Sequence, residues 1–390
     1  MDNEKTLIES KEKKSLLKYK NIIEDKINKF NSNKNKTKDK RITKNVLSFD
    51  IGSTNIKIVE GSFNNGKLTI ENCLKISTPL NSVAEGQIEV RDAVTTMIGA
   101  ALRQYNIRTK NAICTTNPTA LINREIAIPK VEEDEIETVV RYEIQQYLPI
   151  NLDDCILQTT IINEFDDEFE GKTKYNVRVI VYPKQVALEY YKLLIDLNLK
   201  PYTLDVNFNS LNKFINITNL NIEYNDRSSI ALLDMGANFI DVNIYKGENL
   251  DFTRRIKFGG NDIDNLLVLE GAYELEEAKG IKYNNVDLTK SDFNRKVENK
   301  IVGDAIDEMI EKVDMILQFY RNSSAGKDVK RLFIFGGTSK IKGLNKYMGK
   351  RLGIKVSNLS NVSNIAFKKA EYNGEMLSDY ANAIGAIIRL

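Results

Sequence analysis

The sequence predicts a protein of two lobes, each built from strands and helices. The chain has 390 residues, 42% of them hydrophobic, which is enough to bury a core in each of two lobes. One local pattern occurs twice, at 46–61 and at 230–247: an apolar strand, then Asp-x-Gly, then a strand of alternating residues. Because the copies lie 184 positions apart, each is expected to begin one lobe.

The first copy predicts a hairpin whose tip is suited to phosphate. Gly52 lets the backbone turn sharply and approach a ligand. Backbone N–H groups, with the hydroxyls of Ser53 and Thr54, form a concavity that accommodates an anion. Asp50, at the end of the strand, would repel phosphate directly, so we expect it to hold Mg²⁺, usually through water.

The second copy repeats this chemistry with Asp234 as the strand-end carboxylate and with Gly236, Ala237 and Asn238 at the tip. An ordinary hairpin is the alternative explanation for either copy alone. Two copies that open two lobes favour a site in which both tips hold one polyphosphate, with Asp50 and Asp234 as the metal ligands.

Two further patterns follow, of which the first, a glycine turn at a helix N-terminus, is a place where a nucleotide can lie against the backbone. Residues 330–340 form an apolar strand that ends in Gly336, Gly337 and Thr338, and a helix is predicted from about Ile341 to Leu352. Glu276 and Lys279 are three positions apart in a predicted helix and therefore share a face, although a surface ion pair explains that spacing equally well.

The remaining helical patterns are at the C-terminus and in the middle of the chain. Residues 380–386 predict a helix whose small side chains allow close helix packing. Ile136, Val139, Val140, Ile144 and Leu148 have amphipathic spacing after an acidic first turn.

The N-terminal arm differs from the rest of the chain in charge. Residues 1–44 carry a net charge of +7 and the remaining residues a net charge of −5. Apolar residues at helical spacing alternate with lysines, which predicts a basic amphipathic helix; its apolar positions are Leu16, Tyr19, Ile23, Ile27 and Phe30. Residues 28–45 are polar and read as a linker. The arm is expected either to contact an anionic membrane or to be a solvated segment.

The composition excludes several classes of protein. With no His, neither Ser-His-Asp catalysis nor a His-ligated zinc site is available. Cys73, Cys114 and Cys155 are isolated, which fits a reducing compartment, and no apolar run is long enough to span a bilayer. There is no GxxxxGK[ST] or GxGxxG motif and no nucleic-acid-binding motif, so we expect a cytoplasmic protein without a nucleic-acid partner.

These motifs, in this order, resemble those of the actin/Hsp70/sugar-kinase superfamily over residues 46–390. Asp50–Lys57 resembles the first phosphate motif, Asp234–Ile240 the second, and Ile334–Ile341 the adenosine motif. The resemblance implies an α/β actin-like ATPase fold with two lobes, each with an RNase H-like sheet, and ATP·Mg²⁺ between them. It implies nucleotide contacts from Asn55 and Lys57, and adenosine contacts from Glu276 and Lys279. It places the first connecting helix at 204–211, where Asp205 is the candidate to orient water, although it could equally cap a helix.

Within the superfamily, the chain resembles the PilM-type pilus assembly family. The helix followed by Tyr-Leu-Pro-Ile-Asn-Leu-Asp-Asp, between Glu143 and Asp154, carries that resemblance, as do 182–184 and 202–206. It implies a first lobe at 46–118 plus 375–390, an inserted subdomain at 119–195 and a second lobe at 196–374, while the basic arm at 1–45 is not part of the family pattern.

The family resemblance also implies a function. It implies an ATP-binding component of the type IV pilus machine at the inner face of the membrane, which binds the N-terminal cytoplasmic peptide of a PilN-type protein against 119–195. Hydrolysis is expected to be slow, since Asn207 stands where relatives often carry Glu. The alternatives are an FtsA-like filament-forming ATPase and a small-molecule kinase.

Overall fold

The computed structural model describes residues 44–389 except 169, 219, 221–227, 248, 291–295, 324–327 and 361. The predicted basic helix at 16–30 and almost all of the linker lie outside the described residues. The chain forms two compact units, one of residues 118–197 and the other of residues 44–117 together with 198–389. The larger unit contains two sheets, and each sheet with its helices is called a lobe below.

The first lobe is built on a six-stranded sheet with the order β10-β6-β1-β2-β3-β16. Its strands are β1 (Val46–Ile51), β2 (Asn55–Asn64), β3 (Lys67–Ser77), β6 (Asn111–Thr116), β10 (Lys200–Val206) and β16 (Ile365–Phe367). Strands β1, β2 and β3 form an antiparallel meander, and β6 lies parallel to β1 on its other side. Every residue of β1 is buried, which explains its apolar composition.

Helices of this lobe are α2 (Arg91–Gln104), α5 (Asn207–Thr218) and α10 (Leu377–Ile387), and a short hairpin of β4 (Val83–Ala84) and β5 (Gln87–Ile88) follows β3. The prediction of a C-terminal helix with close packing is confirmed, because α10 packs against α5. A Cβ atom on Gly385 would lie 2.1 Å from the carbonyl oxygen of Ser210, so only glycine permits this approach.

The second lobe repeats the arrangement with the strand order β13-β12-β11-β14-β15. Its strands are β11 (Ser228–Met235), β12 (Ile240–Lys246), β13 (Asn249–Ile256), β14 (Asp328–Phe335) and β15 (Lys355–Asn358). Again three strands form an antiparallel meander, and β14 lies parallel to the first of them. The predicted repeat in the sequence is therefore a repeat of the fold.

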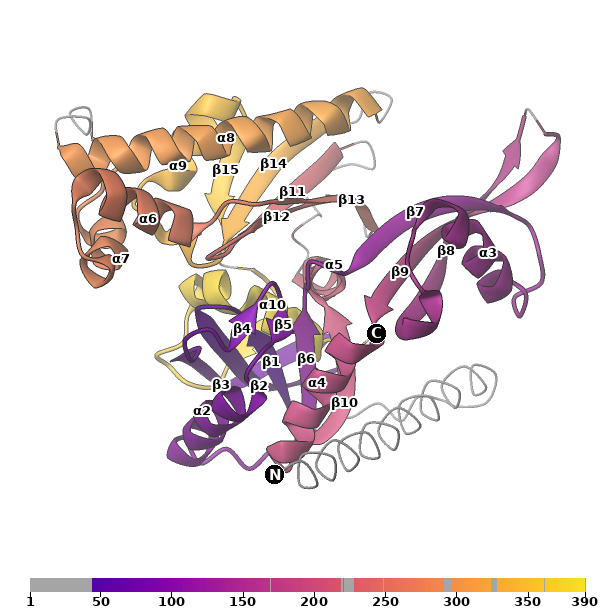
Figure 1. The fold of residues 1–390 in the computed structure, drawn as a ribbon, viewed down its shortest axis with the longest axis horizontal. Coiled ribbons are helices and arrows are strands. Elements are labelled where there is room, and N and C mark those ends of the chain that lie inside the picture. Colours follow the sequence, from indigo (N-terminus) through magenta and orange to yellow (C-terminus); the bar gives the residue numbers. More distant parts are fainter. Residues whose placement is uncertain are drawn as a thin grey trace, which may run out of the picture. The chain divides into compact units, whose positions relative to one another are not determined.

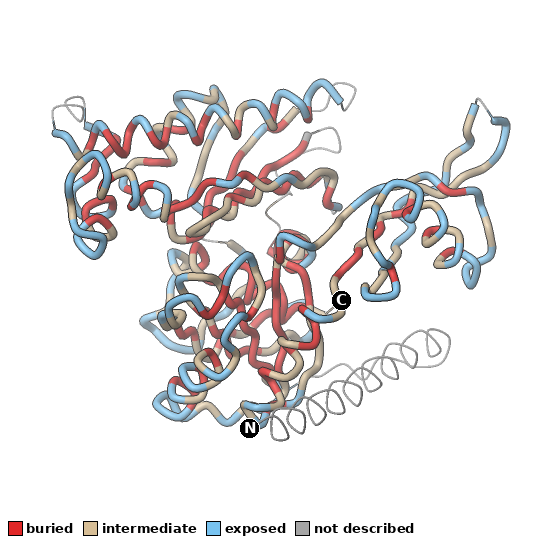
Figure 2. The backbone as a smooth tube through the Cα atoms, viewed as in Figure 1, coloured by how far each residue is buried: buried red, intermediate tan, exposed pale blue. Residues whose placement is uncertain are grey.

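The helices of the second lobe are α6 (Gly260–Gly271), α7 (Leu275–Asn284), α8 (Val297–Ser323) and α9 (Leu344–Leu352). The long helix α8 runs along the second sheet and buries Met309, Val313 and Leu317 in its core (Figure 1). Figure 2 shows that buried residues follow the strands of both sheets.

Three boundaries differ from those predicted. Strands β10 and β16 belong to the first sheet, although the sequence predicts residues 196–374 as the second lobe. Residues 204–206 end β10, and the connecting helix begins only at Asn207. Helix α9 begins at Leu344 rather than at about Ile341, because a 3₁₀ turn, η3 (Thr338–Lys340), comes first.

The smaller unit, residues 118–197, has its own sheet with the order β7-β9-β8. Its elements are β7 (Ile122–Pro129), α3 (Ile136–Tyr147), η1 (Leu152–Asp154), β8 (Cys155–Asp167), β9 (Lys172–Pro183) and α4 (Lys184–Asp196). The amphipathic spacing in α3 is confirmed, since Ile136, Val140 and Ile144 are buried against the sheet residues Val177, Val179 and Val181. In the described part of the chain, no helix is both long and apolar enough to cross a membrane.

Candidate nucleotide-binding cavity

A cavity of about 530 Å³ lies inside the larger unit, and both hairpin tips line it. Of the residues predicted from sequence, thirteen face this cavity; they are Asp50, Gly52, Ser53, Thr54, Asn55, Lys57, Asp234, Gly236, Ala237, Asn238, Lys279, Gly337 and Thr338. The volume is in the range of about 300–1,000 Å³ that is typical of small-molecule sites. The two halves of the sequence repeat therefore meet at one site.

The two tips have the same backbone geometry. The N–H of Gly52 donates to the carbonyl oxygen of Asn55 over 3.0 Å, and the N–H of Gly236 donates to that of Phe239 over 2.9 Å. A Cβ atom on either glycine would lie 3.0 Å from the accepting oxygen, which explains why both copies keep glycine.

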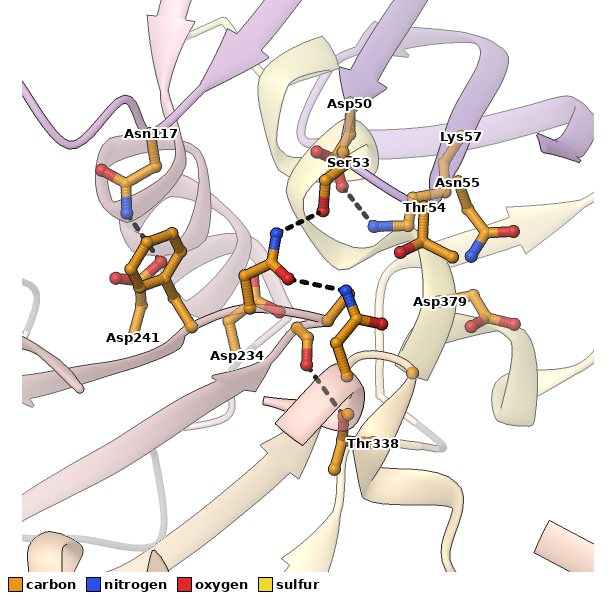
Figure 3. Close-up of a pocket in the computed structure, with 18 of the residues that line it drawn as sticks. Asp50, Ser53, Thr54, Asn55, Lys57, Asn117, Asp234, Asp241, Thr338 and Asp379 are labelled. Atoms are coloured by element: carbon orange, nitrogen blue, oxygen red, sulfur yellow. Dashed lines mark hydrogen bonds and ion pairs between the residues drawn. The ribbon is translucent and has the colours of Figure 1, made fainter. Parts of the chain in front are cut away.

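The tips also contact one another. The side-chain amide of Asn238 donates to the Ser53 hydroxyl over 3.0 Å and accepts from the amide of Asn261, 2.6 Å away. Figure 3 draws the hydrogen bond to the Ser53 hydroxyl as a dashed line. Ser53 and Asn238, both predicted to face phosphate, thus line the cavity where the two lobes touch.

The two predicted metal ligands lie in different electrostatic surroundings. Lys57 Nζ is 3.0 Å from Asp50 Oδ2, and although burial alone would lower its pKa, Asp50 and Asp234 raise it (Figure 3). Burial raises the pKa of Asp234 to about 7, while Lys57 and the amide of Asn382, which donates over 2.7 Å, act in the opposite direction. The Asp234 carboxylate therefore gains its full charge only above neutral pH.

No group of three or more His, Cys, Asp or Glu side chains is arranged to hold a metal in the described ranges. Asp50 and Asp234 line one cavity as two single carboxylates, one from each lobe. Such a pair fits Mg²⁺, which takes one or two carboxylates and completes its coordination with water and phosphate oxygens.

The glycine turn after β14 forms another wall of the cavity. Gly336 has φ +88°, and a Cβ atom there would lie 2.8 Å from Asp234 Oδ1, so glycine is needed at this turn. Gly336 itself, although predicted to contact nucleotide, does not line the cavity. Gly337 and Thr338 do line it, and the Thr338 hydroxyl donates to the carbonyl oxygen of Gly236 over 2.8 Å.

The two residues of the predicted pair on α7, Glu276 and Lys279, do not both face the cavity. Lys279 lines the cavity. Glu276 has 84% of its side chain exposed, and its carboxylate forms an ion pair with Lys279 Nζ at 2.5 Å. A second lysine on the same helix, Lys282, lines the cavity instead, and it is buried in an ion pair with Asp264 at 2.7 Å. Sequence reasoning missed this pair, although Gly259-Gly260 at the start of α6 marks a close backbone approach at this wall.

Asp205, predicted to orient water, does not line the cavity. Its carboxylate accepts from Lys213 Nζ at 2.5 Å and from the amide of Asn209 at 2.8 Å, and Arg389 lies 3.6 Å away. Burial alone would raise the pKa of Asp205, but Lys213, Asn209 and Arg389 hold it below its usual value. The carboxylate is thus engaged in a buried network, and it is Asn207, two residues later, that faces the cavity.

Several lining residues were not singled out by the sequence motifs. Lys75, Asn117, Asp241, Arg255, Lys340 and Asp379 face the cavity and were not predicted. Asp379 on α10 pairs with both Lys75 and Lys340, which come from different lobes. Only the pairing of strands brings Lys75 opposite Lys57 and Arg255 opposite Asp241.

Two lobes with matching sheets and a cavity between paired hairpin tips define the actin-like ATPase fold. Among solved structures, the chain is similar to a PilM–PilN type IV pilus biogenesis complex, with a TM-score of 0.75 and 20% identity over 89% of this chain and 98% of the other. It is also similar to the ethanolamine utilization protein EutJ from Carboxydothermus hydrogenoformans, with a TM-score of 0.51 and 13% identity over 87% and 88% of the two chains.

Residues 48–389 match the family described as type IV pilus assembly protein PilM, and the chain belongs to that family. The family resemblance drawn from the hairpin tips and from the segment 143–154 is thereby confirmed, as is the predicted actin-like fold.

Proposed function

We propose that this protein is a nucleotide-dependent scaffold of the type IV pilus assembly machine and that it binds ATP·Mg²⁺ in the cavity. One observation carries the proposal: the two hairpin tips, with Asp50 and Asp234, line a single cavity together with Lys57. Glycine turns, hydroxyls and a lysine are groups that bind phosphates.

The chemistry of the lining supports a polyphosphate with a divalent cation rather than a free anion. Lys57 and Lys75 supply positive charge from the first lobe, while Asp50 and Asp234 would repel an uncompensated phosphate. Bound Mg²⁺ would neutralise the phosphate oxygens, with Asp50 and Asp234 holding it through its water.

The nucleoside is proposed to lie against Gly337, Thr338, Lys279 and Lys282. These residues come from the turn after β14 and from α7 and form one wall of the cavity. Glu276, whose side chain is exposed and pairs only with Lys279, is left out of this proposed contact set.

Any hydrolysis is proposed to be slow. The carboxylate of Asp205 is engaged by Lys213 and Asn209, and Asn207 presents an amide to the cavity. An amide cannot accept a proton from attacking water at neutral pH, so Asn207 does not serve as a general base.

The partner is proposed to be the N-terminal cytoplasmic peptide of a PilN-type membrane protein, bound through residues 118–197. A complex of PilM with PilN is among the similar structures, and α3 in this unit exposes two large aromatic side chains, Tyr142 at 68% and Tyr147 at 71%. Aromatic residues of this kind are enriched at peptide and protein interfaces. Such binding would keep a cytoplasmic protein at the inner face of the membrane, beside the assembly ATPases that drive pilus motility.

The peptide proposal is tested by calorimetric titration of the full chain with that peptide, with and without ATP·Mg²⁺. We expect binding that changes in affinity when nucleotide is added, because lobe closure favours one conformation of the protein. The double change Tyr142→Ala with Tyr147→Ala should weaken binding about tenfold or more, since such aromatic residues dominate interfaces. Phe319→Ala, an exposed aromatic on α8, is the matched control. Absence of peptide binding in both nucleotide states would contradict the proposal.

A further inference from the structure

Two rows of charged side chains follow from the register of the two meanders. In each meander, the strand-end aspartate pairs with a residue of the second strand, and that residue pairs with one of the third strand. The rows are Asp50–Lys57–Lys75 in the first lobe and Asp234–Asp241–Arg255 in the second. All six side chains line the cavity. Arg255 is therefore the counterpart of Lys75 in the opposite lobe.

Arg255 is held by a carboxylate and a carbonyl oxygen at the cavity wall. Its Nε donates to Asp241 Oδ1 over 2.7 Å, and its Nη2 donates to Asp241 Oδ2 over 3.0 Å and to the backbone oxygen of Asn117 over 2.8 Å. The guanidinium also lies 5.0 Å from the centre of the Phe239 ring. Arginine can bind a phosphate group with the same bidentate geometry that it has here with the Asp241 carboxylate.

The same cluster joins the two lobes. The side-chain amide of Asn117, which follows β6 of the first lobe, donates to Asp241 Oδ2 on β12 of the second lobe over 2.8 Å (Figure 3). Arg255 itself donates to the backbone oxygen of Asn117, so a ligand that draws Arg255 away from Asp241 also removes a contact between the lobes.

The strand order determines which end of a nucleotide Arg255 would meet. In the second sheet, β11 with Asp234 is central, β14 with its glycine turn is on one side, and β12 and β13 are on the other. The proposed nucleoside wall follows β14, so a polyphosphate crossing the tip of β11 extends toward β12 and β13. In this arrangement Arg255, on β13, would meet the last phosphate.

We propose that Arg255 exchanges Asp241 for the terminal phosphate of a nucleoside triphosphate and so distinguishes triphosphate from diphosphate. The inference rests on the proposed nucleotide site and adds to it a residue that determines specificity. A phosphate with a charge close to −2 competes better for the guanidinium than a single carboxylate does. The exchange releases Asp241 and removes the hydrogen bond from Arg255 to the backbone oxygen of Asn117. The number of phosphates on the nucleotide would therefore change a contact between the two lobes.

The test is calorimetric titration of the full chain with ADP·Mg²⁺ and with a non-hydrolysable ATP analogue and Mg²⁺. Arg255→Ala should reduce the preference for the triphosphate about tenfold or more, because charge-assisted hydrogen bonds to the last phosphate are lost, with ADP affinity little changed. Arg255→Lys should retain part of the preference, since the charge stays but the bidentate geometry does not. Arg254→Ala, the exposed neighbour on the same strand, is the matched control and should behave as the wild type.

A second variant keeps the inference testable if Arg255→Ala folds poorly. Asp241→Asn frees the guanidinium from its competitor and should raise triphosphate affinity several-fold, an effect that should vanish when Arg255 is also replaced. If Arg255→Ala and Asp241→Asn both left the ratio of triphosphate to diphosphate affinity unchanged, the proposed role of Arg255 would be overturned, while the proposed nucleotide site would stand. If the wild type bound neither nucleotide, the proposed nucleotide site would fail, and this inference with it.

Discussion

Asp205→Ala should lower the free energy of unfolding by about 3–5 kcal/mol and leave nucleotide affinity within about twofold of wild type. Lys213 and Asp205 are both buried, and their charges compensate one another at 2.5 Å. Removing the carboxylate leaves the ammonium of Lys213, together with Arg389, without its counter-charge. A buried charge that loses its partner is strongly destabilising.

Urea denaturation and nucleotide titration of the same variant separate the two roles considered for Asp205. Asp304→Ala, an exposed carboxylate on α8, is the control and should change stability by less than about 0.5 kcal/mol. A variant as stable as the wild type but with altered nucleotide binding or turnover would favour the role in orienting water.

Gly385→Val should destabilise the protein by about 3 kcal/mol, because it forces α10 away from α5. Even the first added carbon would lie 2.1 Å from the Ser210 carbonyl oxygen and 3.3 Å from Phe214 Cβ. Both neighbours are buried and belong to a helix, so neither has room to move. The measurement is the shift in thermal and urea unfolding relative to wild type.

Gly280→Ala supplies the contrast for this prediction. Gly280 is also inside a helix, α7, but the nearest atom to an added Cβ is Asn284 Nδ2 at 3.7 Å, an ordinary contact. Alanine there should stabilise the protein by about 0.5–1 kcal/mol through its better helix propensity. If both glycine replacements had the same effect, the close approach of α10 and α5 would not be the cause.

Local chemistry explains why the hairpins, α3 and α10 were predictable from sequence. A glycine at a turn, a buried apolar strand and the spacing of Ile136, Val140 and Ile144 are properties of short segments. The close packing of α10 was predictable because its small residues are contiguous in the chain.

Contacts between segments far apart in the chain explain what sequence reasoning missed. Arg255 and Lys75 reach the cavity through strand register, and β16 joins the first sheet through only three residues. Asp205 does not line the cavity as predicted. An acidic residue just before a helix gives the same sequence pattern whether its carboxylate faces a ligand or, as here, pairs with a lysine of the following helix, Lys213. Glu276 and Lys279 share a helix, yet only the tertiary arrangement decides which of them faces the cavity.

Proton binding at Asp234 gives the proposed nucleotide site a pH dependence. Because the pKa of this carboxyl is about 7, the charged form that would hold Mg²⁺ increases about tenfold between pH 6 and pH 8. ATP itself also titrates, so the contribution of Asp234 is read as the difference between wild type and Asp234→Asn. The same raised pKa means that folding stability due to this group is highest at acidic pH and is lost as pH rises toward 7.

Titration of the full chain with ATP and Mg²⁺ by isothermal calorimetry, at pH 8 and pH 6, tests the central claim most directly. We predict saturable one-site binding that is stronger at pH 8. Asp50→Ala and Asp234→Ala should each weaken it about tenfold or more, since each removes a carboxylate that would hold the cation. Phe319→Ala, outside the cavity, should leave it unchanged. Equal ATP affinity in the wild type and in both aspartate variants would contradict the assignment of this cavity as the nucleotide site.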